Sequence, residues 1–362
     1  MRTKNFIIPV ILAGFILSTI SLPASALPIN KQEKKEQESE IVIIPDKVKA
    51  IFKEGVSTRQ ARLDIPFSII WNIFLPARQN MHSVFYFKVK NADLGFIPVP
   101  QAQEAVKTKE EEKAETPALY QTSGHVFLQF NRLENNTVQE VAREVYIPLN
   151  LQAEGKSYDP EKEEFYSTGY PLPPGDYLLA MAIASLDLEK IGTQYYEFSL
   201  PSALSFTEEL GTTPVFFIKD IKRMQAAETR AEVHKEFFTY SVLQITPNIG
   251  NIFSVGENLD IFFFIFGTAP NEEGKHDIEI NYEVLKGEET AIRYAKAHYE
   301  NPLVSQPLPM KKTVIVKTEK EGEKVEKKEQ HDLEPGQYTL QIDIKDNVTG
   351  KSVKKSVAFE VK

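Results

Sequence analysis

The sequence predicts an all-β protein built from two tandem β-sandwich domains. The segment Leu-x-Pro-Gly-x-Tyr-x-Leu occurs at residues 172–179 and again at 333–340. After each copy, apolar residues recur at every second position, which is the period of a half-buried strand. A polar stretch follows, at 187–190 in one copy and 347–350 in the other, and then a second alternating run. We therefore expect a turn, a strand, a polar hairpin and a second strand in each copy.

The turn residues give the repeat a physical reason. Pro presets one backbone angle, and Gly175 and Gly336 accept the positive φ that other residues resist. Tyr177 and Tyr338 follow two positions later and resemble the tyrosine corner of immunoglobulin-like and fibronectin-type sandwiches. In that corner the ring packs into the core and its hydroxyl bonds the backbone a few residues upstream. A generic Pro-Gly turn before a strand is the alternative, and the matching context of the two copies favours the corner.

The order of the other segments supports a duplication. Residues 80–87 resemble 258–265, and the alternating residues 126–130 resemble 278–282. Both halves thus run from an aromatic strand to an alternating strand, the Pro-Gly-x-Tyr corner and a closing hairpin. We predict two tandem immunoglobulin-like β-sandwich domains, at residues 63–201 and 237–362.

The N-terminus has the composition of an export signal. Two basic residues precede an apolar run that ends at Ala24-Ser25-Ala26, so we expect a signal peptide at 1–26 rather than an uncleaved anchor. Residues 27–62 are expected to form a polar tether and a short N-terminal segment, with a brief helix capped by Asp46 and stopped near Gly55.

The first predicted domain begins with a strictly alternating strand from Leu63 to Leu75, in which Trp71 is expected to be a core residue. Residues 99–118 carry a charge run without periodicity and are expected to be a mobile insertion. Residues 202–236 are expected to be a linker, partly helical in its polar portion. In the second domain, residues 313–316 predict a hairpin whose charged tip, 317–330, extends beyond the sandwich.

Composition limits the class of protein. The formal charge is −9 over 362 residues, and no basic face interleaved with aromatics is evident, which argues against nucleic-acid binding. No stretch after the signal approaches 18 clean apolar residues, so no membrane span is expected in the mature chain. There is no cysteine, which excludes disulfides and thiolate sites. The protein is expected to be exported, periplasmic or extracellular.

Motifs of catalysis are missing from the sequence. The six histidines form neither His-x-x-x-His nor His-Glu-x-x-His, and neither Gly-x-Ser-x-Gly nor a phosphate-binding glycine loop occurs. Asp343 and Asp346 lie near a hairpin and give only a weak calcium signal. We assign no catalytic, cofactor-binding or metal residues, and the structural residues are Gly175, Tyr177, Gly336, Tyr338 and Trp71.

A wider resemblance rests on residues 62–66 and 84–96. These segments are similar to those of uncharacterised exported bacterial proteins that carry Gly-Trp-x-Thr-Asp domains. The Gly-Trp-x-Thr-Asp motif itself is absent here, since Trp71 has a different context. The resemblance implies a sandwich fold and no particular activity.

We therefore expect an exported, non-enzymatic binding or scaffolding protein of the bacterial cell envelope, with an unknown protein or polysaccharide partner and no cofactor. One alternative is a carbohydrate- or polymer-binding module that uses exposed aromatics, for which Tyr195, Tyr196 and Tyr299 are candidates. A second alternative is a carboxylate-dependent hydrolase, with adjacent acidic residues such as Glu163-Glu164 and Glu288-Glu289.

Overall fold

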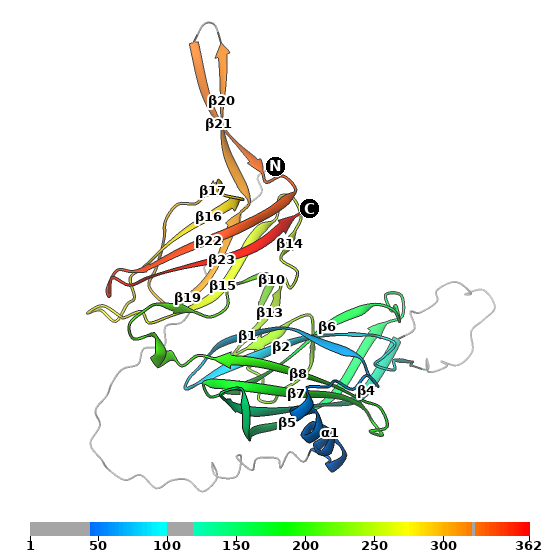
Figure 1. Cartoon of the computed structure of the whole chain (residues 1–362). Helices are drawn as coiled ribbons and strands as arrows, with labels where there is room; N and C mark the ends of the chain where they lie inside the picture. The colour runs from blue at the N-terminus through cyan, green and yellow to red at the C-terminus, as the bar shows by residue number, and fades with distance from the viewer. Residues whose placement is uncertain (1–43, 100–118, 321–322) are drawn as a thin grey trace, which may run out of the picture. The chain divides into compact units, whose positions relative to one another are not determined.

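The all-β prediction is confirmed by the computed structural model, in which strands make up most of the chain and one α-helix is present (Figure 1). The structure describes residues 44–99, 119–320 and 323–362. The predicted signal peptide, the start of the tether and nearly all of the 99–118 insertion lie outside the described residues. Within the described residues, the helix is too short and too polar to cross a membrane.

The first eight strands form two antiparallel sheets, which we call the first half. One sheet has the order β1-β2-β6, and the other has the order β5-β4-β7-β8, with β3 paired to β4. Their bounds are β1 Phe67–Ala77, β2 Asn80–Lys90, β3 Ile97–Pro98, β4 Leu119–Glu134, β5 Thr137–Glu154, β6 Glu163–Leu172, β7 Gly175–Ser185 and β8 Ile191–Leu200.

The later strands form the two sheets of the second half. One has the order β12-β13-β10-β15-β19, and β9 also pairs with β15; the other has the order β14-β23-β22-β16-β17, and β18 also pairs with β16. Their bounds are β9 Gly211–Thr212, β10 Phe216–Arg223, β12 Phe238–Tyr240, β13 Leu243–Pro247, β14 Ile252–Phe253, β15 Asn258–Phe266, β16 Ile278–Lys286, β17 Glu289–Arg293, β18 Ala297–Tyr299, β19 Leu303–Pro309, β22 Gly336–Asp346 and β23 Ser352–Val361.

The two halves repeat one strand order. The sheet β1-β2-β6 corresponds to β10-β15-β19, and β5-β4-β7-β8 corresponds to β17-β16-β22-β23. The register agrees as well, because Tyr177 pairs with Phe198 in the first half and Tyr338 pairs with Phe359 in the second. Segments 161 residues apart in sequence, as Tyr338 is from Tyr177, thus form the same four-stranded arrangement around an equivalent tyrosine.

One detail of the predicted alignment is wrong. Val126 pairs with Ile183, whereas Ile344, which corresponds to Ile183, pairs with Ile280. Residues 126–130 therefore correspond to 280–284 rather than to 278–282. The error has a physical origin, since a slip of two residues along a strand leaves every side chain on its original face.

Each half has its own hydrophobic core between its sheets. The first core gathers buried side chains from both first-half sheets, among them Phe85, Phe130 and Tyr177. The second does the same for the second half, with Phe263, Tyr282 and Tyr338. Burial of such large apolar side chains is the main stabilising contribution to each half.

A third cluster joins strands of the two halves, and it explains why strand β1 departs from its prediction. A β-bulge between Ile69 and Trp71 reverses the alternation, so that Ile69 packs on the first core while Ile73 and Leu75 lie in the third cluster. Trp71 is half-buried and packs there, with ring centroids 5.6 Å from Tyr86 and 5.9 Å from Phe216.

The segment predicted as a linker, 202–236, contains strands that belong to both halves. Within it, β10 pairs with β13 and β15 of the second half. Strand β11 (His234–Lys235) pairs with β6 of the first half instead. The polar portion expected to be partly helical has no α-helix, and the only helical turn in this segment is the 3₁₀ helix η1 (Ala203–Phe206).

The predicted N-terminal helix is present as α1 (Asp46–Thr58), and it is longer than expected. Asp46 is its first residue, and Pro45 occupies the cap position instead. The buried side of the helix packs on the outer face of β7 and β8, where small alanines leave room for it. The cluster comprises Ile44, Val48, Phe52, Phe127, Ala180, Ala182, Ala184 and Ile191.

The predicted hairpin around 313–316 is confirmed by strands β20 (Lys311–Lys320) and β21 (Glu323–Asp332), which form a two-stranded sheet of their own (Figure 1, orange). The hairpin follows β19 directly and precedes the second corner. Leu333 donates its backbone N–H to the carbonyl of Met310, so the residue that follows β21 lies beside the residue that precedes β20.

Candidate functional site

The two predicted corners have the same hydrogen bond. The Tyr177 hydroxyl donates to the carbonyl of Pro173 at 2.9 Å, and the Tyr338 hydroxyl donates to the carbonyl of Glu334 at 2.8 Å. Both acceptors lie four residues upstream, as a tyrosine corner requires. Gly175 and Gly336 have φ values of 145° and 155°, in the region that favours glycine.

The surroundings of the two tyrosines match as well. Each ring stacks on the phenylalanine of the next strand, Phe198 in the first half and Phe359 in the second. Each ring also has a cation above it, Arg132 at 5.4 Å from Tyr177 and Lys286 at 5.5 Å from Tyr338. Burial raises the pKa of Tyr177, which keeps the hydroxyl protonated. The corners hold the fold and leave no group free for chemistry.

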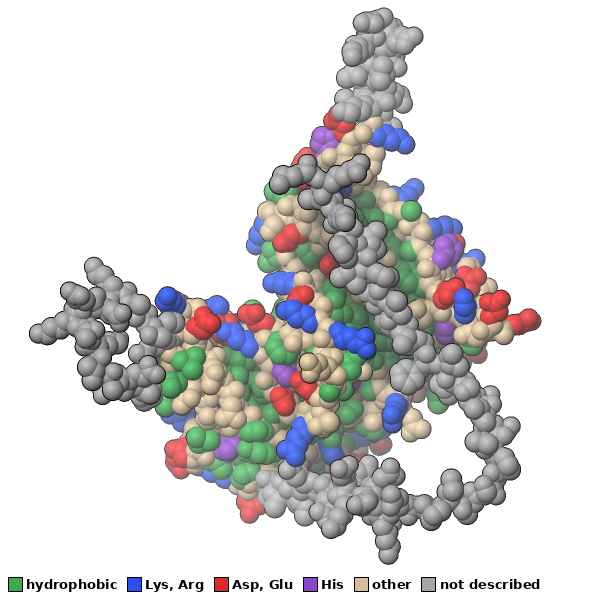
Figure 2. Space-filling model, turned by 180° about the vertical axis from the view of Figure 1, so that it is seen from behind, with side chains coloured by type: hydrophobic (Ala, Val, Ile, Leu, Met, Phe, Trp, Pro, Cys, Tyr) green, Lys and Arg blue, Asp and Glu red, His purple; other side chains and the backbone are tan. Residues whose placement is uncertain are grey.

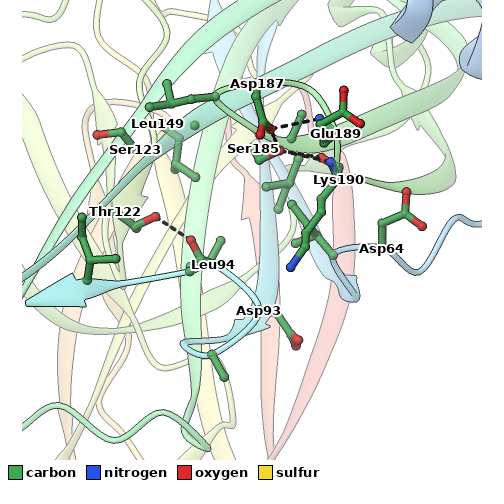
Figure 3. Close-up of a pocket in the computed structure, with 18 of the residues that line it drawn as sticks. Asp64, Asp93, Leu94, Thr122, Ser123, Leu149, Ser185, Asp187, Glu189 and Lys190 are labelled. Atoms are coloured by element: carbon green, nitrogen blue, oxygen red, sulfur yellow. Dashed lines mark hydrogen bonds between the residues drawn. The ribbon is translucent and has the colours of Figure 1, made fainter.

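One candidate ligand site is an open pocket of 610 Å³ at one end of the first half (Figure 3). We call this end, formed by the β2–β3 loop 91–96, the β7–β8 turn 186–190 and the start of β4, the open loop end. The loop is held by Thr122, whose hydroxyl donates to the carbonyl of Leu94 at 2.5 Å. The labelled polar side chains of Figure 3 come from all three segments.

Four carboxylates line this pocket, and three of them already have partners. Asp64 accepts from Arg62 and from the backbone N–H of Ile191, which hold its pKa below the ordinary value. Asp187 accepts from Ser185 and from the N–H of Glu189, and these bonds likewise lower its pKa. The bonds of Asp187 are typical of a carboxylate that forms a turn, whereas Asp64 joins two segments that lie far apart in the chain.

The remaining charges at the pocket are balanced. The Glu189 carboxylate lies 3.7 Å from the ammonium of Lys47, which in turn donates to the carbonyl of Leu188 at 2.7 Å. Asp93 is half-buried and Lys190 is exposed, and both line the pocket. With Arg62, Lys47 and Lys190 beside four carboxylates, the open loop end has one excess negative charge.

Large apolar side chains stand exposed around the open loop end. Leu63, Ile97 and Leu186 are 68%, 59% and 63% exposed, respectively. Ile97 and Leu186 line the pocket, and Leu63 precedes the lining residue Asp64. Grouped exposed apolar side chains are a property of binding surfaces.

The equivalent end of the second half is closed by one buried carboxylate. Asp346, at the position of Ser185, accepts from Ala269 N–H at 3.1 Å, from Val348 N–H at 3.2 Å and from the Thr349 hydroxyl at 2.7 Å. These bonds tie the β22–β23 turn to the β15–β16 loop. Asp343, the other residue considered for calcium, pairs instead with Lys354 at 3.2 Å.

The three aromatics considered for carbohydrate binding are all half-buried. Tyr195 lies beneath helix α1, where its hydroxyl occupies the space that a side chain at Gly55 would need. Tyr196 packs on the first core, and Tyr299 hydrogen-bonds Tyr282 at 2.9 Å. None of the three is therefore the exposed platform that this alternative needs, because burial in the fold already occupies their faces.

The carboxylates considered for hydrolysis are also placed by the structure. Glu163 pairs with Lys88 at 2.8 Å, and Glu164 lies between two lysines of strand edges β6 and β11. A general acid needs a raised pKa, and burial produces this at Asp260, in a separate pocket that Glu257 also lines. Glu257 accepts from the N–H of Ser254 at 2.8 Å, which is the bond of a turn.

No protein-family model matches the chain, and no curated protein matches its sequence. Sequence reasoning missed the open loop end because Leu63, Ile97 and Leu186 lie far apart in the chain, in segments that were interpreted as polar or as strand. The available signal was the pair of leucines at positions 186 and 188, within a hairpin whose other residues are charged.

Proposed function

We propose that the protein is an exported, non-enzymatic binding or scaffolding protein of the bacterial cell envelope, composed of two tandem immunoglobulin-like or fibronectin-type sandwiches. Its partner would be held at the open loop end of the first half. The repeated strand order, with the corner at the start of β7 and of β22, supports the sandwich assignment.

The observation that carries the binding role is the difference between equivalent ends. Asp346 seals one end with three hydrogen bonds, whereas the other keeps a 610 Å³ pocket with exposed apolar side chains. Loops at one end of a sandwich are where binding residues of such folds reside, because the sheets hold them rigidly.

The rim favours a protein partner. Leu186 and Ile97 offer apolar area, and the paired charges around them, such as Arg62 with Asp64, suit the polar rim of a protein interface. On the face of the molecule seen in Figure 2, Lys and Arg side chains are interspersed with Asp and Glu. That surface gives no preference for a polyanion.

The test is capture of envelope proteins by the full mature chain and by the variant Ile97→Ser/Leu186→Ser. The matched control is Leu204→Ser, since Leu204 is 82% exposed in η1 and does not line the pocket. A partner held by the parent chain and by the control, and lost from the double variant, is the expected result. A partner retained equally by all three proteins would refute the open loop end as the binding face.

Polysaccharide binding is a second candidate because of one observation. The rings of Tyr120 and Tyr158 stack with centroids 4.1 Å apart, and Phe96 lies 5.5 Å from Tyr158. Phe96 adjoins pocket residues Gly95 and Ile97 in sequence. A glycan array distinguishes the two candidates: hits that vanish in Tyr158→Ala would support a sugar partner, and an array without hits would favour a protein.

Export has its own test, because the predicted signal lies outside the described residues. Expression with the full N-terminus should yield a mature protein that begins at Leu27, as measured by intact mass and fractionation. A chain that retains residue 1 and remains in the cytosol would overturn the localisation part of the proposal.

A further inference from the structure

The crossover between β10 and β12 brings together side chains that ligate metals. Glu228, Glu232 and His234 each offer one ligand atom, and these three atoms lie within 4.8 Å of one another. Among the described residues, this is the group of acidic and imidazole side chains whose possible ligand atoms lie this close together. We propose that these three residues bind one divalent transition-metal ion, with zinc as the best match.

The donor set supports a transition metal. One imidazole and two carboxylates form a mixed nitrogen–oxygen set, which Zn²⁺ accepts, whereas Ca²⁺ takes only oxygen ligands. The His234 Nε2 atom hydrogen-bonds Oε2 of Glu228 at 3.0 Å, so these two ligand atoms are already close enough to share one ion in place of the proton. Three protein ligands also leave a fourth position of a tetrahedral zinc site for water or another group.

Two of the ligands are oriented by neighbours outside the set. The hydroxyl of Thr239 donates to Oε2 of Glu228 at 2.7 Å, and the ring of His234 stacks on Phe237 at 4.7 Å. The side chains of His234 and Glu228 are only 11% and 27% exposed. Such outer partners fix ligand orientation in metal sites and affect metal affinity.

The pocket beside the cluster contains a further nitrogen donor. Its volume is 310 Å³, and His82 of strand β2 lines it together with the three proposed ligands. His82 is set on the first-half sheet, opposite Pro171 and Gly169 of β6. An additional imidazole in the same pocket strengthens the case for a transition metal, because imidazole is the ligand such ions most often bind.

A metal here would fasten three elements of the fold. Glu228 and Glu232 come from the crossover, His234 from β11 on the first-half sheet, and the supporting Thr239 from β12 of the second half. Binding of an ion to the folded form alone stabilises that form by mass action. Zinc would therefore tie the crossover directly to β11 of the first-half sheet, and to β12 through the hydrogen bond of Thr239 to Glu228.

The experiment uses the full mature chain after removal of metals by a chelator. Zinc binding is measured by isothermal titration and by the shift of the melting temperature. The comparison includes the ligand variant Glu228→Gln/His234→Ala, the outer-partner variant Thr239→Val, and the control Glu288→Gln/His298→Ala, which changes the same residue types elsewhere. Circular dichroism checks that each variant folds.

We expect one Zn²⁺ per chain and a higher melting temperature for the parent and the control. The ligand variant should lose both effects, and Thr239→Val should weaken zinc affinity by about 10- to 100-fold. The inference is overturned if the parent binds no Zn²⁺, if the ligand variant binds it as tightly as the parent, or if only Ca²⁺ binds. Loss of partner capture at the open loop end would not affect this result, so the two proposals fail separately.

Discussion

The two halves of this chain have equivalent ends that are closed in different ways. In the second half, the fully buried carboxylate of Asp346 receives three hydrogen bonds and ties two loops together. In the first half, Ser185 occupies the same position, and its hydroxyl takes part only in the exposed β7–β8 turn. The turns themselves have equal length, since Ser185 N–H bonds the Lys190 carbonyl as Asp346 N–H bonds that of Lys351.

This difference separates what the fold needs from what the proposed binding role would use. Both halves keep the corner, the stacked phenylalanine and the strand order, so these features maintain the sandwich. At this end the first half has a 610 Å³ pocket lined by Ile97 and Leu186, which are 59% and 63% exposed, whereas in the second-half turn Val348 is 42% exposed. The first half lacks the hydrogen bonds of Asp346 and exposes Leu186, which should lower its stability. A binding role at this end would explain why such a loss is tolerated.

The largest effect should come from the sealed end. Asp346→Ala removes the acceptor for two backbone N–H groups and one hydroxyl in part-buried bonds, and we expect a loss of roughly 3 kcal/mol, about 1 kcal/mol for each bond. The equivalent Ser185→Ala lies at an exposed turn and should cost about 0.5 kcal/mol. Urea unfolding of both variants measures the difference. Equal losses would break the comparison between the two ends.

The corners should give the next largest effects. Tyr338→Phe leaves one carbonyl without its donor and should cost about 1 kcal/mol. Tyr177→Phe should cost more, about 1–2 kcal/mol, because Arg132 also donates to this hydroxyl at 2.8 Å. Urea midpoints measure both. Unchanged midpoints in the two variants would mean that the corner bonds contribute nothing.

Acid should weaken the open loop end by a smaller amount. The bonds from Arg62 and Ile191 hold the pKa of Asp64 below its ordinary value of 3.8. The folded state therefore binds the proton less readily than the unfolded state. The stabilisation that ionised Asp64 gives to the folded state is present above pH 3.8 and is lost as pH falls through the pKa of Asp64 in the folded state. Asp64→Asn should flatten this part of the stability profile between pH 2 and about 5. A parent profile identical to that of the variant would contradict the assignment.

Much of the fold was predictable because its signals are local. The Pro-Gly turn, the tyrosine two residues later and the alternation of Leu179, Met181 and Ile183 all lie within a dozen residues, and they fix a strand and its inward face. The hairpin around 313–316 was predictable for the same reason. Each local preference agrees with the final structure, which is the property of a well-specified fold.

The missed features depend on contacts between distant residues. The bulge at Ile69 reverses a perfect alternation, and its reason is that β1 contributes to two cores, the second of which includes Phe216. The linker prediction had a similar limit, because β11 is a strand only by pairing with β6. Tyr195 was expected to be exposed, and only the packing of α1 at Gly55 shows otherwise.

The candidate site was the least predictable part. Its pocket arises where a loop after β2 meets a turn after β7, about 90 residues apart in the chain. The ligands Glu228, Glu232 and His234 are close in sequence, yet their spacing matches no common metal motif. Their convergence follows from the route of the crossover between the sheets, and that route is set by tertiary pairing.

Amide hydrogen exchange of the intact mature protein tests the central difference most directly. The relevant pairs are the N–H groups of Ala269 and Val348, held by Asp346, and those of Glu189 and Lys190, held by Asp187 and Ser185. We expect the first pair to exchange more than about tenfold more slowly, the factor given by 1.4 kcal/mol of opening free energy. Equal rates, or slower exchange at Glu189 and Lys190, would contradict a sealed end in the second half and an open one in the first.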